Sequence, residues 1–234
     1  MERIDRILRG LLDFSRAPQP KTERVDLAAF LGSCVQALKD QRQLDGIETH
    51  VKAAELPGIE IDAGRLRQVV FNIAVNAHDA MNGAGRLDIA AEAVTHDDQA
   101  ILESKLHGGE RESRVAFTDL TRRGIAFSSR PSFDAGERLV AVHFRDSGAG
   151  LSPDAVARVF EPFFTTKPPG QGTGLGLAIC QRIIEDFGGV MRFESRAANG
   201  DGPHGTVVSL YVPITPRRAR AEDRDDLLAS LEAL

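Results

Sequence analysis

A glycine-rich loop carries the clearest chemical signal in this sequence. Gly172, Gly174 and Gly176 alternate along the chain and lead into a segment whose apolar residues recur every three or four positions up to Ile184, which predicts a helix. A helix N-terminus presents free N–H groups and the positive end of the helix dipole, so it binds anions such as phosphate. The loop is not of the Walker A kind, because no Gly-Lys-Ser/Thr follows it.

Two asparagines upstream of this loop could hold a divalent cation. Asn72 and Asn76 share one face of a stretch with helical apolar spacing, and Asp62 is suited to cap its start. Amide oxygens can complete the oxygen shell of Mg2+ when phosphate oxygens supply the other ligands. Asp79 follows three residues after Asn76 and lies on the same face. Taken alone, the asparagines could equally be ordinary polar positions on a half-exposed helix.

A third signal combines a carboxylate with glycines at the end of a strand. Residues 139–145 alternate apolar and polar side chains, which predicts a strand, and Asp146-Ser-Gly148-Ala-Gly150 follows directly. Glycine lets a ligand approach the backbone closely, because it has no side chain and tolerates positive φ. Asp146 could then accept a hydrogen bond from that ligand. By itself, such a pattern is more often a turn than a binding site.

A phenylalanine-rich stretch separates the two glycine loops. We expect residues 151–172 to form a lid over the site, because the stretch joins two loops that would both contact the ligand. Phe160, Phe163 and Phe164 would pack this lid down. Lys167 would reach towards a terminal phosphate, although a lysine in a lid could instead be simply solvated.

In their order along the chain, the stretches that begin at Asn72, Asp146, Phe160 and Gly172 resemble the N, G1, F and G2 boxes of sensor histidine kinases. These boxes belong to the catalytic ATP-binding domain, part of the GHKL superfamily shared with gyrase B, heat-shock protein 90 and MutL. The resemblance covers residues 22–213. It implies an α/β fold, a two-layer sandwich of the Bergerat type in which helices cover one face of a mixed sheet. It also implies ATP and Mg2+ as cofactors.

The resemblance further implies roles for individual residues. Asn76 would hold Mg2+, and Asp146 would accept the exocyclic amine of adenine. Thr206 would support Asp146 through a hydroxyl or water contact; its plainer interpretation is a residue of high strand propensity at the start of the strand predicted for Gly205–Pro213. Asn72, Asn76 and Lys167 are the candidate catalytic residues. The candidate nucleotide-binding residues are Asn76, Asp79, Asp146, Gly148, Gly150, Phe160, Thr166, Lys167, Gly172, Thr173, Gly174, Leu175, Gly176, Leu177 and Thr206.

Four segments are expected. Residues 1–16 have the apolar spacing of an amphipathic helix and resemble the second helix of a truncated dimerisation hairpin, which would allow a homodimer; the alternative is a helix packed on its own domain. Residues 17–23 form a linker, residues 24–213 the catalytic domain, and residues 214–234 a tail. Residues 96–137 are an insert between two strands, most simply a solvated hairpin and alternatively a regulatory surface.

Composition restricts the partners and the location. The formal net charge of −5 and the absence of a long Lys/Arg run argue against nucleic acid as a partner. Cys34 and Cys180 fall in separate apolar patterns, as expected for core residues in a reducing compartment. No apolar run approaches the ~20 residues that a membrane span needs. We therefore expect a cytoplasmic protein without direct membrane insertion.

The expected activity is phosphoryl transfer from ATP to a protein histidine. Gyrase-like ATPases carry a glutamate as general base where this chain has Asn72, so hydrolysis is not favoured. No histidine of the chain fits the phosphoacceptor motif, so the acceptor would lie on a hairpin absent from this chain, with a response regulator downstream, and the chain alone would be inactive. Many members of the family carry a phosphate-binding lysine at the position of Asp79. In having an aspartate there, the chain resembles nitrogen-sensor-like kinases. The alternatives are a non-catalytic nucleotide-sensing adaptor and a Ser/Thr kinase of the anti-sigma-factor kind.

Overall fold

The computed structural model describes residues 21–53, 56–96, 120, 123–129, 133–134, 136–168, 172–198 and 204–215. The helix expected at residues 1–16, most of the linker and the tail after residue 215 lie outside the described residues. The described strands are β1 (Glu23–Val25), β2 (Ile47–Ala53), β3 (Ile59–Ile61), β4 (Gly85–Thr95), β5 (Ile125–Phe127), β6 (Arg138–Asp146), β7 (Val190–Arg196) and β8 (Gly205–Pro213). The described helices are α2 (Leu27–Asp40), α3 (Ala63–Ala80), α6 (Pro153–Val156) and α7 (Gly176–Asp186).

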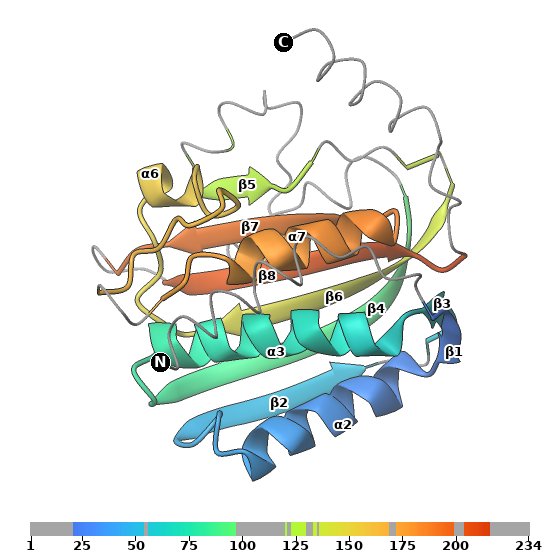
Figure 1. The fold of residues 1–234 in the computed structure, drawn as a ribbon, viewed down its shortest axis with the longest axis horizontal. Helices are drawn as coiled ribbons and strands as arrows, with labels where there is room; N and C mark the ends of the chain where they lie inside the picture. Colours follow the sequence, from blue (N-terminus) through green and yellow to red (C-terminus); the bar gives the residue numbers. More distant parts are fainter. Residues whose placement is uncertain are drawn as a thin grey trace, which may run out of the picture.

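Six strands form the main sheet, in the order β2-β4-β6-β8-β7-β5. β2 pairs with β4 in parallel, whereas the other neighbours are antiparallel, so the sheet is mixed. Helices α2, α3 and α7 lie side by side across one face of this sheet (Figure 1). β1 and β3 form a separate two-stranded sheet. The predicted two-layer α/β sandwich is confirmed.

The helix that carries the two asparagines forms for local reasons. The Asp62 carboxylate accepts a hydrogen bond from the Arg65 amide at 3.0 Å and so caps the start of α3, as expected of an N-cap aspartate. The apolar residues of the predicted stripe, which include Leu66, Val70 and Ile73, are buried against the sheet and α7. The stripe fixes the rotation of α3, and the polar face with Asn72 and Asn76 is turned towards the glycine loop.

The described part of the insert extends the sheet, so the expectation of a solvated hairpin was wrong for this part. β5 pairs with β7, and the Ser195 amide donates to the Gly124 carbonyl at 2.8 Å. On the other side, the Gln181 side-chain amide donates to the Ser128 carbonyl at 3.1 Å, which joins the insert to α7. Residues 97–119 of the insert lie outside the described residues. The pairing satisfies backbone groups on β7 that would otherwise form a sheet edge.

Both cysteines lie in the core, as expected. Cys34 and Cys180 are buried and not joined in a disulfide. Among the helices of the described ranges, none is both long and apolar enough to cross a membrane.

Candidate functional site

Asp146 ends β6 with one carboxylate oxygen fully engaged and the other available. Oδ1 accepts hydrogen bonds from the backbone amides of Gly148 at 2.9 Å and Thr206 at 3.2 Å. The residue is only 7% exposed. Burial raises the pKa of this carboxyl to about 6, although the two amide hydrogen bonds act in the opposite direction. Neither bond uses Oδ2, so this oxygen can accept a hydrogen bond from a ligand.

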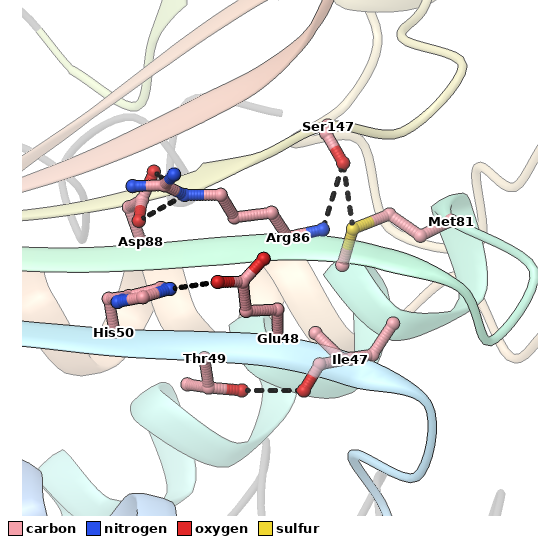
Figure 2. Close-up of polar contacts among 8 residues, drawn as sticks. All are labelled: Ile47, Glu48, Thr49, His50, Met81, Arg86, Asp88 and Ser147. Atoms are coloured by element: carbon pink, nitrogen blue, oxygen red, sulfur yellow. Dashed lines mark hydrogen bonds and ion pairs between the residues drawn. The ribbon is translucent and has the colours of Figure 1, made fainter.

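The loop after Asp146 is clamped to the end of α3. A Cβ at Gly148 would lie 2.8 Å from the Ala80 carbonyl oxygen, and the Ala149 amide donates to the same oxygen at 3.2 Å. The Ser147 hydroxyl accepts a hydrogen bond from the Arg86 amide at 2.9 Å and reaches the Met81 sulfur at 3.5 Å (Figure 2). This clamp between α3 and the start of β4 fixes the direction in which Asp146 points.

Gly150, the second glycine of this loop, is required by its backbone. It has a φ of +66°, and a Cβ there would overlap the Arg196 carbonyl oxygen. Only glycine combines this conformation with such a close approach. The glycine therefore sets the path of the chain from the strand into the lid.

Thr206 supports Asp146 through its backbone, which differs from the hydroxyl or water contact expected from the resemblance. Its hydroxyl instead lies 2.9 Å from the Ser195 hydroxyl. Ser195 in turn accepts a hydrogen bond from the Leu151 amide at 2.9 Å, so it joins β7 to the first residue of the lid. Ser195 was not among the predicted site residues, because its place depends on its pairing with Thr206 across β7 and β8.

The glycine loop leads into α7, whose N-terminus has no side-chain cap. Leu175 occupies the N-cap position of α7 without a side-chain capping bond, so the first-turn N–H groups remain available to an anion. Gly174 has a φ of +67° and packs directly on the backbone of Phe163. The Asn72 side-chain amide donates to the Gly176 carbonyl at 3.5 Å, which ties α3 to this loop. Leu177 is partly buried and packs against the core.

The lid contacts α3 through three polar side chains, those of Asn76, Asp79 and Lys167. The Lys167 ammonium donates to Asp79 Oδ2 at 2.5 Å and to Asn76 Oδ1 at 3.3 Å. The Asn76 oxygen therefore already faces a cation, and such an oxygen suits Mg2+. Within the described residues, no group of three or more His, Cys, Asp or Glu side chains could hold a metal. A metal at Asn76 would thus need phosphate oxygens as further ligands.

The lid differs from expectation at one of its phenylalanines. Phe160 packs edge-on against Phe193, with ring centroids 6.5 Å apart, and the Arg158 guanidinium lies 4.5 Å from the Phe164 ring centroid. The prediction that Phe163 packs the lid down was wrong, because its side chain is 62% exposed. Its φ of +68° and the hydrogen bond that its backbone N–H donates to the Gly174 carbonyl turn the side chain outward.

The other predicted lid and loop residues differ in their surroundings. Thr166 is exposed, and the Thr173 hydroxyl accepts a hydrogen bond from the Leu175 amide at 3.3 Å. A Cβ at Gly172 would lie 2.6 Å from the Thr165 hydroxyl, so a glycine here lets the end of the lid pack closely against Thr165. Leu175 is buried and belongs to the core. Residues 169–171 lie outside the described residues.

The site lies on a mixed sheet and has a buried hydrogen-bond acceptor, Asp146, at one end. At the other end, the uncapped N-terminus of α7 lies beside the Lys167 ammonium and its two oxygen partners. This arrangement is typical of a nucleotide-binding α/β sandwich. The family of histidine kinase-, DNA gyrase B- and HSP90-like ATPases matches residues 61–216. The chain belongs to this family.

Relatives of the chain include sensor kinases. The chain is 31% identical over 220 residues to the sensor kinase CckA of Brucella abortus (strain 2308), a match that covers 93% of this chain and 20% of that protein. It is 25% identical over 218 residues to the sensor histidine kinase ZraS of Salmonella typhimurium (strain LT2), covering 93% of this chain and 37% of the relative. The chain thus spans well under half the length of these two relatives.

Solved structures of histidine kinases share the fold. The structure of full-length ShkA in complex with AMPPNP superposes with a TM-score of 0.60 at 24% identity, covering 93% of this chain and 36% of that one. The catalytic domain of ThkA superposes with a TM-score of 0.54 at 25% identity, covering 84% and 97%. The family match, the sensor-kinase relatives and this shared fold together identify the chain as an ATP-binding catalytic domain of the histidine kinase type.

Proposed function

We propose that this chain binds MgATP and transfers the γ-phosphoryl group to a histidine on a dimerisation hairpin. The observation that carries the proposal is Asp146, whose Oδ1 is saturated by two backbone amides while Oδ2 stays available. Such an acceptor fits the 6-amino group of adenine. A keto group at the same position of the base would face a carboxylate and be rejected.

The phosphate end supports transfer rather than hydrolysis. Mg2+ would be held by Asn76 and by phosphate oxygens, and it would neutralise charge on the polyphosphate. The first turn of α7 would bind phosphate oxygens through its free N–H groups. Asn72 donates to the Gly176 carbonyl, and its neutral amide does not act as a general base on water. These residues therefore bind and orient the nucleotide.

The acceptor and the partners are part of the proposal. Phe163 presents an exposed apolar ring beside the glycine loop, which supports docking of an apolar helix such as that of a phosphoacceptor hairpin. One structural neighbour, ThkA, has been solved in complex with the response regulator TrrA. We extend this to a response regulator as the downstream partner of this chain, and to a homodimer through residues 1–16. A cytoplasmic location follows from the need for ATP.

The test is transfer to an acceptor supplied separately. The chain is incubated with ATP labelled at the γ-phosphate, alone and with a purified histidine-bearing hairpin from a related sensor kinase. We expect label on the hairpin only, lost in acid and kept in alkali as for phosphohistidine. The variant Asp146→Asn should give no label, and the variant His78→Ala controls for a histidine close to the phosphate end.

Other outcomes would contradict the proposal in distinct ways. Label that survives acid would indicate a Ser/Thr kinase. Tight binding of MgATP with no label on any hairpin would favour the nucleotide-sensing adaptor. Release of free phosphate at the same rate with and without a hairpin would indicate an ATPase.

A further inference from the structure

The lid is tied to α3 through one lysine. Lys167 lies 88 residues beyond Asp79 in the chain, yet its ammonium contacts both Asp79 and Asn76. The side chains of the pair are 30% and 40% exposed. Ion pairs at such exposure contribute little to the stability of a fold. We therefore look for the role of this pair in the position that it gives the Lys167 ammonium, beside Asn76.

The route of the lysine side chain is set by its own loop. The Lys167 amide donates to the Thr165 hydroxyl at 3.1 Å, which fixes the backbone at the base of the side chain. The aliphatic stem then lies against Gly172, where an added Cβ would be 3.4 Å from the Cβ and Cδ of Lys167. The loop thus directs the stem towards α3.

Asp79 is equally fixed. Its Oδ1 faces His78 Nδ1 at 3.4 Å, while Oδ2 receives the lysine. Partial burial alone would raise the pKa of Asp79, but the hydrogen bonds and charges of Lys167 and His78 outweigh it and leave the pKa below its ordinary value. Asp79 is therefore a carboxylate at neutral pH, and it holds a full negative charge three residues from Asn76.

We propose that Asp79 is a positioning residue that holds the Lys167 ammonium beside Asn76, so that the lid supplies a cation to the polyphosphate of ATP. This inference rests on the proposed function. An ammonium has three donor hydrogens, and Asp79 holds one of them whether Asn76 contacts the ammonium, as here, or a metal ion. A further hydrogen can therefore reach a phosphate oxygen while the pair of Asp79 and Lys167 stays intact. The pair also cancels a carboxylate charge that would otherwise repel the polyphosphate.

The test compares a triphosphate with a diphosphate. Calorimetric titrations with MgAMPPNP and MgADP give the ratio of their dissociation constants, which isolates contacts to the terminal phosphate. We expect Asp79→Asn to lower the preference for the triphosphate about tenfold, the loss of one charge-assisted hydrogen bond, with little change for MgADP. Lys167→Met should have the same effect.

Double variants show whether Asp79 acts through the lysine. In the Lys167→Met background, Asp79→Asn should cause no further loss, because it then removes only a repulsive charge. The exchanged pair Asp79→Lys with Lys167→Asp places the ammonium on α3 and should restore part of the preference. A merely structural role for Asp79 would predict additive losses and no restoration.

A second readout needs no nucleotide. Hydrogen exchange of the lid amides in residues 158–168 should be faster in Asp79→Asn than in the unmodified protein. The matched control Asp154→Asn removes an exposed charge on α6 and should leave this exchange unchanged.

Opposite results overturn the inference. An unchanged or raised triphosphate preference in Asp79→Asn would mean that the carboxylate competes with the phosphate for the lysine. Unchanged hydrogen exchange of the lid would mean that Asp79 does not hold it. If the unmodified chain bound neither nucleotide, the proposed function would fail, and the exchange comparison would still decide whether Asp79 holds the lid.

Discussion

Replacement of Asp146 by asparagine separates the effect of the buried carboxylate on the stability of the fold from its effect on ATP binding. Burial raises the pKa of Asp146 from 3.8 to about 6, and the amides of Gly148 and Thr206 offset only part of this. At about 1.4 kcal/mol for each pKa unit, the ionised carboxylate costs the nucleotide-free protein about 3 kcal/mol at pH 7. An asparagine has the same shape, and its carbonyl oxygen can accept the same two hydrogen bonds.

The pH dependence follows from the direction of this shift. Since the folded-state pKa of Asp146 is the higher one, the stability carried by its protonated form is fully present below pH 3.8 and is lost as the pH rises through about 6. We expect Asp146→Asn to raise the free energy of unfolding by about 3 kcal/mol at pH 7 and by about half as much at pH 5. Urea unfolding at the two pH values measures both differences.

The same variant should lose ATP binding, because its new amide N–H2 would oppose the amino group of adenine. It should bind ITP better than ATP, since hypoxanthine offers a keto oxygen at that position. Asp88→Asn, at an exposed pair with Arg86, is the control and should change stability by less than about 0.5 kcal/mol. Equal stability of Asp146→Asn and the unmodified protein at both pH values would refute the reasoning.

Three further substitutions, at Gly176, Ser195 and Gly124, test how the site is built, and two others serve as comparisons. Gly176→Ala should leave the free energy of unfolding unchanged or raise it by up to about 1 kcal/mol, because the nearest atom to its Cβ would be Asn76 Nδ2 at 3.8 Å. Calorimetry should nevertheless show weaker MgATP binding by this variant. Gly174→Ala should instead destabilise the fold, because Gly174 has a positive φ and lies against the Phe163 backbone. Ser195→Ala leaves the partly buried Leu151 amide without its acceptor and should cost about 1–3 kcal/mol in urea unfolding, whereas Ser33→Ala on α2 should cost less. Gly124→Ala would overlap the Ser195 carbonyl and should both destabilise the fold and weaken ATP binding; stability loss without any change in affinity would argue against coupling of the insert to the site.

Local signals made much of the fold predictable. A capping aspartate before a helical stripe predicts α3, and the structure has Asp62 at that cap. The strand Gly205–Pro213 was predicted with the bounds that β8 has, because a glycine turn and a proline delimit an apolar β-branched run. Glycines at positive φ, such as Gly150 and Gly174, mark turns that no other residue forms without strain.

Contacts that depend on long-range pairing could not be predicted. Ser195 reaches the site only through its register with Thr206, and nothing in its neighbourhood along the chain signals this. The pairing of Lys167 with Asp79 joins two boxes whose spacing gives no relative orientation. Phe163 was misjudged because a left-handed backbone reverses the direction of a side chain. The roles of the predicted site residues towards ATP stay predictions.

The most direct test of the account is a calorimetric titration of the unmodified chain with a non-hydrolysable ATP analogue, with and without Mg2+, beside Asn76→Ala. The account predicts saturable binding that Mg2+ strengthens, and loss of this strengthening in Asn76→Ala, because the amide oxygen is the protein's ligand to the metal. Absence of binding by the unmodified chain, or an equal response to Mg2+ in both proteins, would contradict it.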